Sequence, residues 1–421
     1  MLNILKDPLY FRFWLSQIIS HLGDGLTRVA IMYLIATLSN NPFIIGIVIF
    51  AQLLPSALFS IFMGPLADKY NRKVIMVSAD LFRMVVVVLM IPFTDSVPIL
   101  ISLIALQGIG SALFDPARAS AIPDLCGEEN LTKAISLSQS TKAAMDIIGP
   151  SIGALLLISQ NYTLIFLIDS STFLLSAILV LTLTTLGKVK GAENKDKEPY
   201  FIMIKSGIST VMGMSGLRFL IILLIPITLV IGILNTNLVA VLTNTFKVTA
   251  FHFGLIEAAL ALGVIVGASF VGPKLISKVS PATVLLSGTA AIGIWMVLVI
   301  PLDYIQQQVG IFPIYIWCIM IGILNALITV PLNSLFLKTT PNSFRGRGSS
   351  LLSFTANNSQ ILGVILGGVI SNGVGVLNGT AIAGSLLVLV ACLLPLLKGY
   401  KEFSYSTNDE SNLTENATSS S

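Results

Sequence analysis

Long apolar runs, separated by short polar breaks, dominate this sequence. A helix needs roughly 20 apolar residues to cross a bilayer, and about twelve such runs can be read along the chain. They begin near Phe13, Phe43, Val74, Val97, Lys133, Tyr162, Leu217, Phe253, Ala282, Phe312, Ser349 and Val376. Only 10% of the residues are charged, whereas soluble domains carry about 25%. We therefore expect an all-α integral membrane protein with twelve transmembrane helices.

The runs fall into two groups of six, and the groups share a feature. A Gly-Pro pair follows the second run in "GPLADKYNRK" and the eighth run in "GPKLISKVSP". Paired six-helix halves are typical of secondary transporters with a site between the halves. The predicted domains are an N-terminal half (1–186), a cytoplasmic linker (187–212), a C-terminal half (213–400) and a disordered cytoplasmic tail (401–421).

Basic residues indicate the orientation of the chain. If the runs alternate across the membrane, nearly every Lys and Arg falls on one side, and Lys247 is the exception. Loops rich in Lys and Arg face the cytoplasm, so both termini are predicted to be cytoplasmic. This asymmetry explains the net charge of +4 without a nucleic-acid partner. The three cysteines are far apart and match no metal or redox pattern.

The stretch "GPLADKYNRK" resembles the signature loop of the major facilitator superfamily. Gly64, Asp68, Arg72 and Lys73 occupy the positions of that motif, and Asn71 stands where the family usually has Gly. Asn also tolerates left-handed turns, so the departure is small. The twelve runs, the linker and the repeated Gly-Pro pair extend the resemblance over essentially the whole chain.

The resemblance implies a cytoplasmic latch that closes the inward side. In the family, the Asp of the motif contacts the start of the eleventh helix, and the Arg pairs with an acid at the end of the fourth. Asp68, Arg72 and Asp115 fit those roles here. The alternative is that the basic residues only follow the orientation rule, which explains Lys73 but neither acid.

The stretch "GPSIGA" in the fifth run partly resembles the antiporter motif of the same superfamily. Gly149, Pro150 and Gly153 match it, whereas Ala154 and Met145 replace expected glycines. The resemblance implies export. Close packing of helices needs the same small residues, so packing is the alternative reading.

Three further segments, "GDG", "DPARASAIPDL" and "FRGRGSS", resemble the drug:proton antiporter branch that contains macrolide exporters and the enterobactin exporter. Lysophospholipid transporters share the first two segments. The resemblance implies a multi-pass, monomeric protein of the cell membrane.

A polar stripe runs through the first helix. Gln17, His21, Asp24 and Arg28 lie on one face at 100° per residue. An ionised side chain near the bilayer centre costs about 2.5–3.5 kcal/mol, so the stripe must face a helix or a water-filled cavity. The first, fourth, seventh and tenth helices line the cavity in the resembled superfamily. Matching stripes on the fourth and tenth runs are Gln107, Ser111 and Asp115, and Asn325, Thr329 and Asn333.

Other charged residues compete for a role in proton coupling. Lys142 and Asp146 are spaced as an i,i+4 pair, and Glu257 has no partner on its own helix. Asp169 lies about two turns into the sixth run. Asp80 and Arg83 are placed near the cytoplasmic face, within reach of the latch.

These observations predict a proton-coupled exporter of an amphipathic small molecule such as a drug, macrolide or siderophore-like compound. Asp24 would carry the proton, with Arg28 as its electrostatic partner; the alternative is an Asp24–Arg28 packing pair. A lysophospholipid transporter is the second hypothesis, and a non-transporting receptor is the third. Motifs for hydrolases, zinc enzymes and nucleotide binding are missing from the sequence, so we expect neither an enzyme nor a cofactor. The expected partners are a small-molecule substrate, protons and the lipid bilayer.

Overall fold

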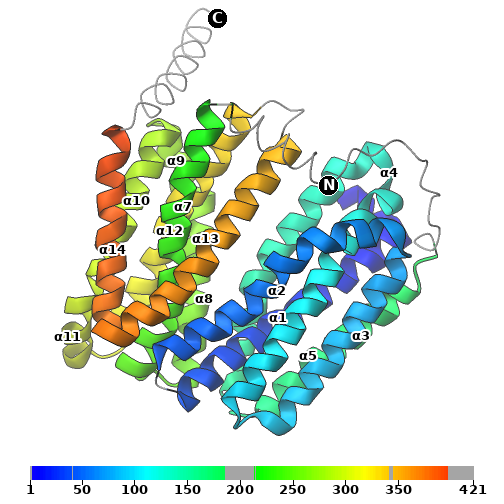
Figure 1. The fold of residues 1–421 in the computed structure, drawn as a ribbon, viewed down its shortest axis with the longest axis horizontal. Helices are drawn as coiled ribbons and strands as arrows, with labels where there is room; N and C mark the ends of the chain where they lie inside the picture. The colour runs from blue at the N-terminus through cyan, green and yellow to red at the C-terminus, as the bar shows by residue number, and fades with distance from the viewer. Residues whose placement is uncertain (1, 40, 185–212, 214, 341–344, 397–421) are drawn as a thin grey trace, which may run out of the picture. The chain divides into compact units, whose positions relative to one another are not determined.

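The computed structural model describes residues 2–39, 41–184, 213, 215–340 and 345–396. The regular structure in those residues is helical, as expected. The chain divides into two compact units (Figure 1). Unit 1 is Met1–Lys195 with Leu242–Ala258, and unit 2 is Asp196–Val241 with Ala259–Ser421. The predicted linker and tail lie outside the described residues, so the predicted domain boundaries stay predictions.

The first half of the chain forms five long helices after a short 3₁₀ turn. Two of these helices begin at the residues that the sequence predicts, Val97 and Tyr162. The bounds are η1 (Leu2–Lys6), α1 (Pro8–Leu38), α2 (Pro42–Lys69), α3 (Arg72–Met90), η2 (Ile91–Phe93), α4 (Val97–Leu157) and α5 (Tyr162–Leu181).

The second half contains longer and shorter helical segments. Phe312 and Val376 again start helices where the sequence predicts them. The bounds are α7 (Ser215–Ala240), η4 (Val241–Thr245), α8 (Ala250–Val266), η5 (Gly267–Val271), α9 (Gly272–Ile276), α10 (Pro281–Val297), α11 (Val299–Val309), α12 (Phe312–Thr339), α13 (Arg345–Val374), α14 (Val376–Leu393) and η7 (Leu394–Leu396).

Two continuous helical segments contain a break. The long α4 consists of two helical legs that meet at Gly127, whose φ of 69° and ψ of 167° are not helical. Glycine adopts this region without the steric cost that a Cβ brings. The pair α10 and α11 is bent by 51°. The fourth and fifth predicted runs correspond to the two legs of α4.

The lengths and compositions of the helices confirm a membrane protein. In the described part of the chain, eight helices are long and apolar enough to cross a membrane, or up to nine if the bent α10–α11 pair is one span. A shorter apolar helix covers Pro42–Pro55. The predicted number of twelve spans therefore stays a prediction.

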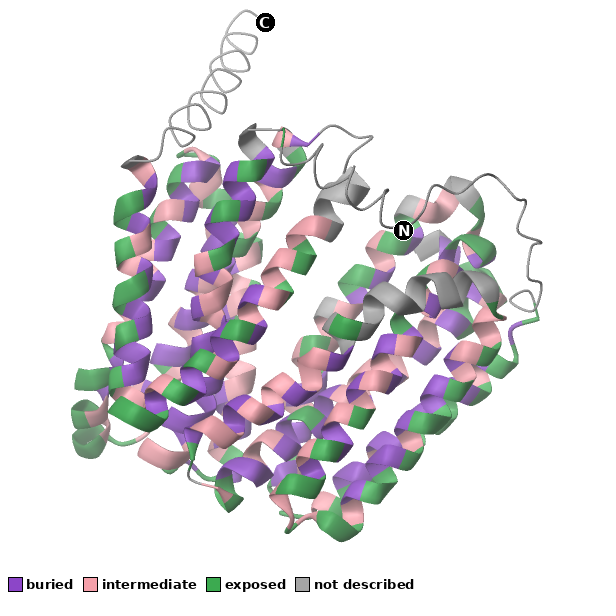
Figure 2. Ribbon diagram, in the orientation of Figure 1, coloured by how far each residue is buried: buried purple, intermediate pink, exposed green. Residues whose placement is uncertain are grey.

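Buried and exposed residues alternate along the helices, as Figure 2 shows. On α3 the exposed side chains include Leu81, Val85 and Leu89, all hydrophobic. The inward face of the same helix carries Asp80 and Arg83, both buried. A helix with hydrophobic residues outside and charges inside is built for surrounding lipid.

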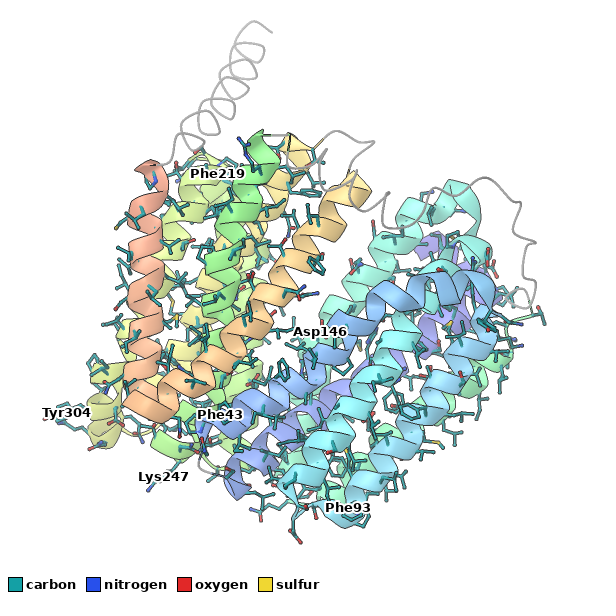
Figure 3. All side chains as sticks on the ribbon, viewed as in Figure 1. Phe43, Phe93, Asp146, Phe219, Lys247 and Tyr304 are labelled. Carbon is teal, nitrogen blue, oxygen red and sulfur yellow. The ribbon has the colours of Figure 1, made fainter. Side chains whose placement is uncertain are left out.

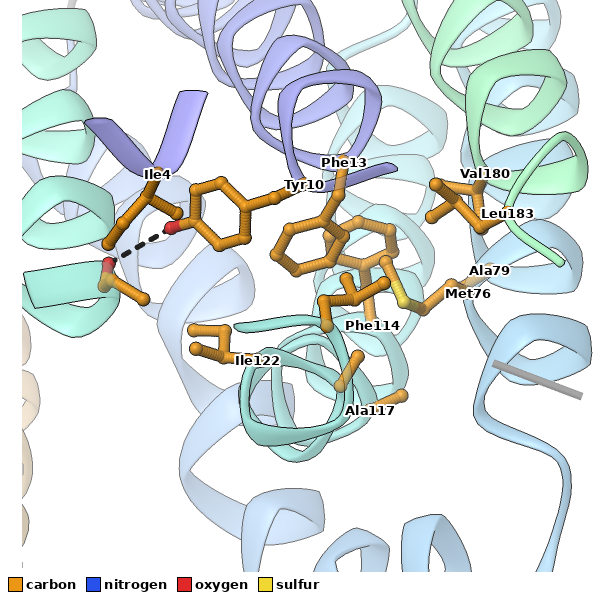
Figure 4. Close-up of a cluster of buried hydrophobic side chains, with 13 residues drawn as sticks. Ile4, Tyr10, Phe13, Met76, Ala79, Phe114, Ala117, Ile122, Val180 and Leu183 are labelled. Carbon is orange, nitrogen blue, oxygen red and sulfur yellow. Dashed lines mark hydrogen bonds between the residues drawn. The ribbon is translucent and has the colours of Figure 1, made fainter. Parts of the chain in front are cut away.

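Apolar clusters lie above and below a polar layer in unit 1. One cluster, drawn in Figure 4, contains Tyr10, Phe13 and Met76, and the Tyr10 hydroxyl donates to the Ala134 carbonyl at 3.2 Å. The other cluster contains Ile35, Val87 and Phe173. Residues 17–28 of α1 and residues 80–83 of α3 lie between the clusters in sequence. The two clusters thus pack α1 and α3 together on either side of the polar layer.

Two turns show how local chemistry shapes the loops. Asn71 is the N-cap of α3, and its side chain accepts from the Lys73 backbone N–H at 3.0 Å. Its φ is −61°, so capping, rather than the expected left-handed turn, explains Asn at this position. Lys247, the exception to the charge asymmetry, is exposed in the turn before α8 (Figure 3).

Candidate functional site

Unit 1 encloses a cavity of about 250 Å³ among α1, α2, α3 and α4. The predicted stripe of α1 and the predicted stripe of α4 both line it. Further walls come from Arg83 of α3 and from the second leg of α4. The polar and charged lining residues are Gln17, Ser20, His21, Asp24, Thr27, Arg28, Gln52, Arg83, Gln107, Ser111, Asp115, Lys142 and Asp146.

Asp24 lies at the centre of a network of hydrogen bonds. Its Oδ2 accepts from Arg83 Nη1 at 3.4 Å, and its Oδ1 accepts from Gln107 Nε2 at 3.5 Å. The side chain of Asp24 is 31% exposed, whereas that of Arg83 is 3% exposed. Asp24 is therefore the cavity-facing end of a charge network that continues into the protein.

The interior end of the network is a buried ion pair within α3. Arg83 Nη2 donates to Asp80 Oδ1, and the Ser176 hydroxyl of α5 donates to the other oxygen of Asp80 at 2.8 Å. Two carboxylates thus share one guanidinium. Burial of such a pair requires that the partners satisfy one another. Both Asp80 oxygens and both terminal Arg83 nitrogens have partners here, whereas Arg83 Nε has none among the described residues.

Aromatic rings fix the position of the Arg83 guanidinium. Its central carbon lies 4.6 Å from the ring centroid of Phe114 and 4.4 Å from that of Phe173. A cation over aromatic faces is attracted by their negative electrostatic potential. A Cβ at Gly110 would lie only 2.5 Å from Arg83 Cγ. The absence of a side chain at Gly110 therefore makes room for the Arg83 side chain, which extends to Asp24.

Arg28 is not the hydrogen-bonding partner of Asp24, although its charge still acts on the Asp24 carboxylate. Among the described residues no ion pair joins them. Arg28 Nη2 instead donates to the Asp146 carbonyl at 3.4 Å, because its long side chain crosses to the second leg of α4. The pair predicted there is present, with Lys142 Nζ 3.4 Å from Asp146 Oδ2.

Gln17 and His21 have different surroundings within the cavity. Gln17 is buried, and its Oε1 accepts from Arg118 at 3.3 Å and from Ser138 at 3.0 Å. These contacts join α1 to both legs of α4. In the described part of the chain, His21 Nε2 is buried without a hydrogen-bond partner. His21 therefore offers a free ring nitrogen beside Asp24.

Three of the residues predicted for proton coupling or for lining the cavity are not among those that line it. Glu257 lies on α8 and is half-buried. Asn325 and Asn333 lie on α12, where Asn325 is half-buried and Asn333 is exposed. The spacing of these two Asn residues with Thr329 gives α12 one polar face, as the sequence indicates.

The predicted Arg72–Asp115 pair is wrong. Arg72 Nη1 donates to Asp124 and to the Ser120 carbonyl, the latter at 2.7 Å. Asp115 instead pairs with Arg118 at 3.3 Å, one turn along its own helix. Asp124 lies about 13 Å farther along α4 than Asp115, which brings it level with the start of α3.

Other members of the predicted gating loop are only partly described. Gly64 and Asp68 fall in the last turns of α2, and their surroundings lie outside the described residues. The Lys73 backbone is held by the Asn71 cap. The contact expected for Asp68 stays a prediction.

The glycines of "GPSIGA" lie where α1 meets the second leg of α4. A Cβ on Gly149 would lie 3.0 Å from the Gly25 Cα, and a Cβ on Gly153 would lie 2.9 Å from the Leu26 Cα. A Cβ on Gly25 would in turn lie 2.8 Å from Pro150 Cδ. The geometry supports close helix packing at the turn of α1 that carries Asp24.

Arg83 and Arg118 belong to the cavity network, although the sequence places Arg83 near the latch and gives Arg118 no role in the cavity. Arg83 lies eleven residues after the start of α3, about 16 Å along a helix. That depth is near the middle of a core about 30 Å thick, not near the cytoplasmic face. Counting turns from the N-cap would have found it. Arg118 had been counted only as part of the charge asymmetry.

The arrangement suits binding of polar groups and protons. No group of three His, Cys, Asp or Glu side chains able to hold a metal ion occurs among the described residues. The cavity combines hydrogen-bond donors and acceptors with apolar walls such as Ile31, Val48 and Ile104. Such a surface fits a molecule with both polar and apolar parts.

Sequence comparison with known proteins places the chain among transporters. The profile of the Major Facilitator Superfamily matches residues 13–363. Macrolide efflux protein A of Streptococcus pyogenes is 24% identical over 393 residues, which cover 92% of this chain and 95% of that protein. The enterobactin exporter of Salmonella typhi is 26% identical over 427 residues, 94% of each chain. The staphyloferrin A transporter of Staphylococcus aureus is 28% identical over 63% of this chain and 67% of its own.

Solved structures support the same fold. The nucleoside transporter NupG superposes with a TM-score of 0.71 at 13% identity, covering 92% of this chain and 99% of that one. A bacterial homologue of the iron transporter ferroportin, inward-facing, gives 0.72 at 13% identity over 94% and 98%. The predicted fold class and the expectation of a non-enzymatic membrane transporter are confirmed. This chain belongs to the Major Facilitator Superfamily.

Proposed function

We propose that this transporter exports an amphipathic small molecule from the cytoplasm in exchange for protons. The observation that carries the proposal is the cavity of unit 1, in which Asp24 faces the cavity while Arg83 anchors it from the protein interior. Relatives along most of the chain are named for macrolide efflux and enterobactin export. A drug, macrolide or siderophore-like compound is therefore the proposed substrate class.

Asp24 is proposed as the proton-carrying group. Its ionised carboxylate accepts from Arg83 and Gln107, and a proton removes its charge. Arg83 would keep its buried partner Asp80, so protonation changes the charge of the cavity without stranding a buried cation. The ionised form offers acceptor oxygens to substrate hydroxyl or ammonium groups. The protonated form withdraws part of that capacity, so proton binding and substrate binding oppose each other.

Alternating access between the two halves is proposed to carry the exchange. Arg72, bound to Asp124 and the Ser120 carbonyl, would tie the start of α3 to α4 on the cytoplasmic side. Asp68 and Asp115 remain part of the proposed gating region. Gly149, Pro150 and Gly153 would keep α1 closely packed against the second leg of α4, so that the two helices move together. Glu257, Asn325 and Asn333 are proposed as further contacts along the path.

The proposed setting is the cell membrane, with both termini in the cytoplasm and the protein acting as a monomer. The support is the one-sided distribution of Lys and Arg. Single cysteines at Asn161 and Asn372, in a variant without the native cysteines, are expected to react with an impermeant reagent added outside sealed cells. A cysteine at Ser406 should react only after the cells are opened, and the reverse pattern would overturn the orientation.

The export proposal is tested with inside-out vesicles. Vesicles that contain the transporter should accumulate a radiolabelled macrolide or an iron-free siderophore when their lumen is acidified. Accumulation should stop when a protonophore collapses the pH gradient. Gradient-independent movement of a labelled lysophospholipid, with no macrolide or siderophore transport, would favour the lysophospholipid alternative, which the relatives named above do not support.

A further inference from the structure

A second acidic residue in unit 1 is wholly buried and has no part in the proposed export cycle. Asp169 lies on α5 and is 0% exposed. Its Oδ1 accepts from the Thr172 hydroxyl at 3.3 Å. Its Oδ2 has no hydrogen-bond partner among the described residues. Asp169 is not among the residues that line the cavity.

The face of α1 opposite Asp169 is shaped to receive it. A Cβ on Gly23 would overlap both the Asp169 carboxyl group and the Thr172 hydroxyl, so the missing side chain makes room for them. Thr27, one turn farther along α1, interacts with the Asp169 side chain. Within the described part of the chain, the Thr27 hydroxyl oxygen is itself buried without a hydrogen-bond partner. Asp169 Oδ2 and the Thr27 hydroxyl oxygen are thus two buried polar atoms without partners at the same α1–α5 contact.

The charged groups around Asp169 do not neutralise it. Asp24 of α1 and Asp80 of α3 are carboxylates. Arg83 of α3 is the cation that acts on Asp169, and its guanidinium is already shared between Asp80 and Asp24. A buried carboxylate without its own cation is strongly unfavourable and takes up a proton instead.

We propose that Asp169 is a second proton-binding site, sealed between α1 and α5 and occupied by a proton in this conformation. A proton on Asp169 removes a buried charge that has no cation of its own. The resulting O–H can donate to the Thr27 hydroxyl oxygen, which is buried without a hydrogen-bond partner among the described residues. The ligand of this site is the proton itself, and the site holds whether or not Asp24 carries the coupling proton.

Infrared spectroscopy of the purified protein tests the proposal without any transported substrate. The protein is prepared with ¹³C-labelled aspartate, so that aspartic acid carbonyl bands are identified by their isotope shift. At neutral pH the wild type should show a carboxylic acid C=O band from aspartate that exchanges slowly in D₂O. The band should be lost in Asp169→Asn and kept in Asp24→Asn, the matched control on the cavity side.

The pH dependence of stability is a second test. If native Asp169 keeps a proton above the ordinary titration range of Asp, near about pH 4, the unfolded chain binds fewer protons than the native protein there. Stability then falls as pH rises, by at most about tenfold in the folding equilibrium constant per pH unit for one proton. Asp169→Asn, which imitates the protonated group, should lack this part of the slope.

Each result decides the proposal. A wild type without an aspartic acid carbonyl band at neutral pH would overturn it, even if Asp169→Asn failed to fold. A band that survives in Asp169→Asn would also overturn it. Loss of the band in Asp169→Asn, with melting at neutral pH above that of the wild type and a flatter pH profile, is the expected result.

Discussion

Asp24 and Asp169 both lie at the middle turns of α1, Asp24 as a residue of α1 and Asp169 on the neighbouring α5. Asp24 faces the cavity with a side chain that is 31% exposed and accepts from Arg83 and Gln107. Asp169 is 0% exposed and faces Gly23 and Thr27. Asp24 can therefore exchange protons with water in the cavity, whereas a proton on the fully buried Asp169 exchanges with water only slowly.

The difference comes from the neighbouring helices rather than from α1 itself. On the cavity side, α3 provides a buried cation and α4 provides an amide. On the sealed side, α5 provides hydroxyl groups and aromatic rings, and close packing excludes water. A carboxyl group therefore becomes exchangeable or sealed according to the donors that the partner helix brings. Variants that act on one side should leave the other side unchanged.

Arg83 joins the two sides, so its removal should have the largest effect. Arg83→Ala leaves Asp80 buried without its cation, and breaking such a pair costs about 3–5 kcal/mol. We expect a strong fall in folded protein and no transport. Yield and melting temperature in detergent check the first effect, and vesicle transport checks the second.

Asp80→Asn combined with Arg83→Gln is the control, because it replaces the charged pair with a neutral hydrogen-bonding pair. The double variant should recover folded protein relative to Arg83→Ala but should transport poorly, since Asp24 has lost its anchor. An Arg83→Ala variant with wild-type stability would show that the buried pair does not hold the helices.

The packing of α1 against the second leg of α4 should give the next largest effect. Gly153→Leu forces a side chain into a space where a Cβ alone would lie 2.9 Å from Leu26 Cα. Overpacking of this kind costs about 1–3 kcal/mol, and melting in detergent measures it. Gly373→Leu is the matched control, because a Cβ there meets nothing within 4 Å. Equal stability of the two variants would contradict the packing role.

The Arg72–Asp124 pair should affect transport more than stability. Arg72 and Asp124 are partly exposed, at 28% and 27%, and exposed pairs contribute about 0–1 kcal/mol. Arg72→Ala should therefore fold normally and transport slowly. Combining it with Asp124→Asn should add nothing, because the two groups act together. Combining it with Asp115→Asn should give additive losses, and the opposite ranking would restore the pairing expected from the sequence.

The smallest effect is expected at the Lys142–Asp146 pair on the cavity side. Both side chains are well exposed, at 42% and 48%, so solvent screens their attraction. Asp146→Asn should leave the melting temperature within experimental error and keep proton-driven transport. Loss of coupling in this variant would move the proton-carrying role from Asp24 to Asp146.

The sequence predicted the helices well because a membrane restricts the chain to few solutions. Apolar length alone gave the starts at Val97, Tyr162, Phe312 and Val376, since any spanning segment must satisfy its own backbone. The α1 stripe was also predictable, because helical periodicity puts its members on one face. Which helix provides each partner was not.

Pairing between helices depends on depth and on side-chain reach, which one-dimensional spacing does not contain. The i,i+4 spacing suggests Arg28 as the ion-pair partner of Asp24, but Arg83 of α3 takes that position. The family resemblance suggested Asp115 for Arg72, yet Asp124 lies at the right level. Asn71 was expected to form a turn, and it caps α3 instead. In each case a neighbouring element decided the contact.

Proton-driven transport by Asp24→Asn is the measurement that tests the central claim most directly. The amide keeps the shape of the protonated carboxyl group but cannot release a proton. In inside-out vesicles with an acidic lumen, macrolide accumulation should fall to the level seen with a protonophore, while exchange of labelled for unlabelled macrolide continues. Accumulation by Asp24→Asn at the wild-type rate per folded molecule would contradict the claim that Asp24 couples export to protons.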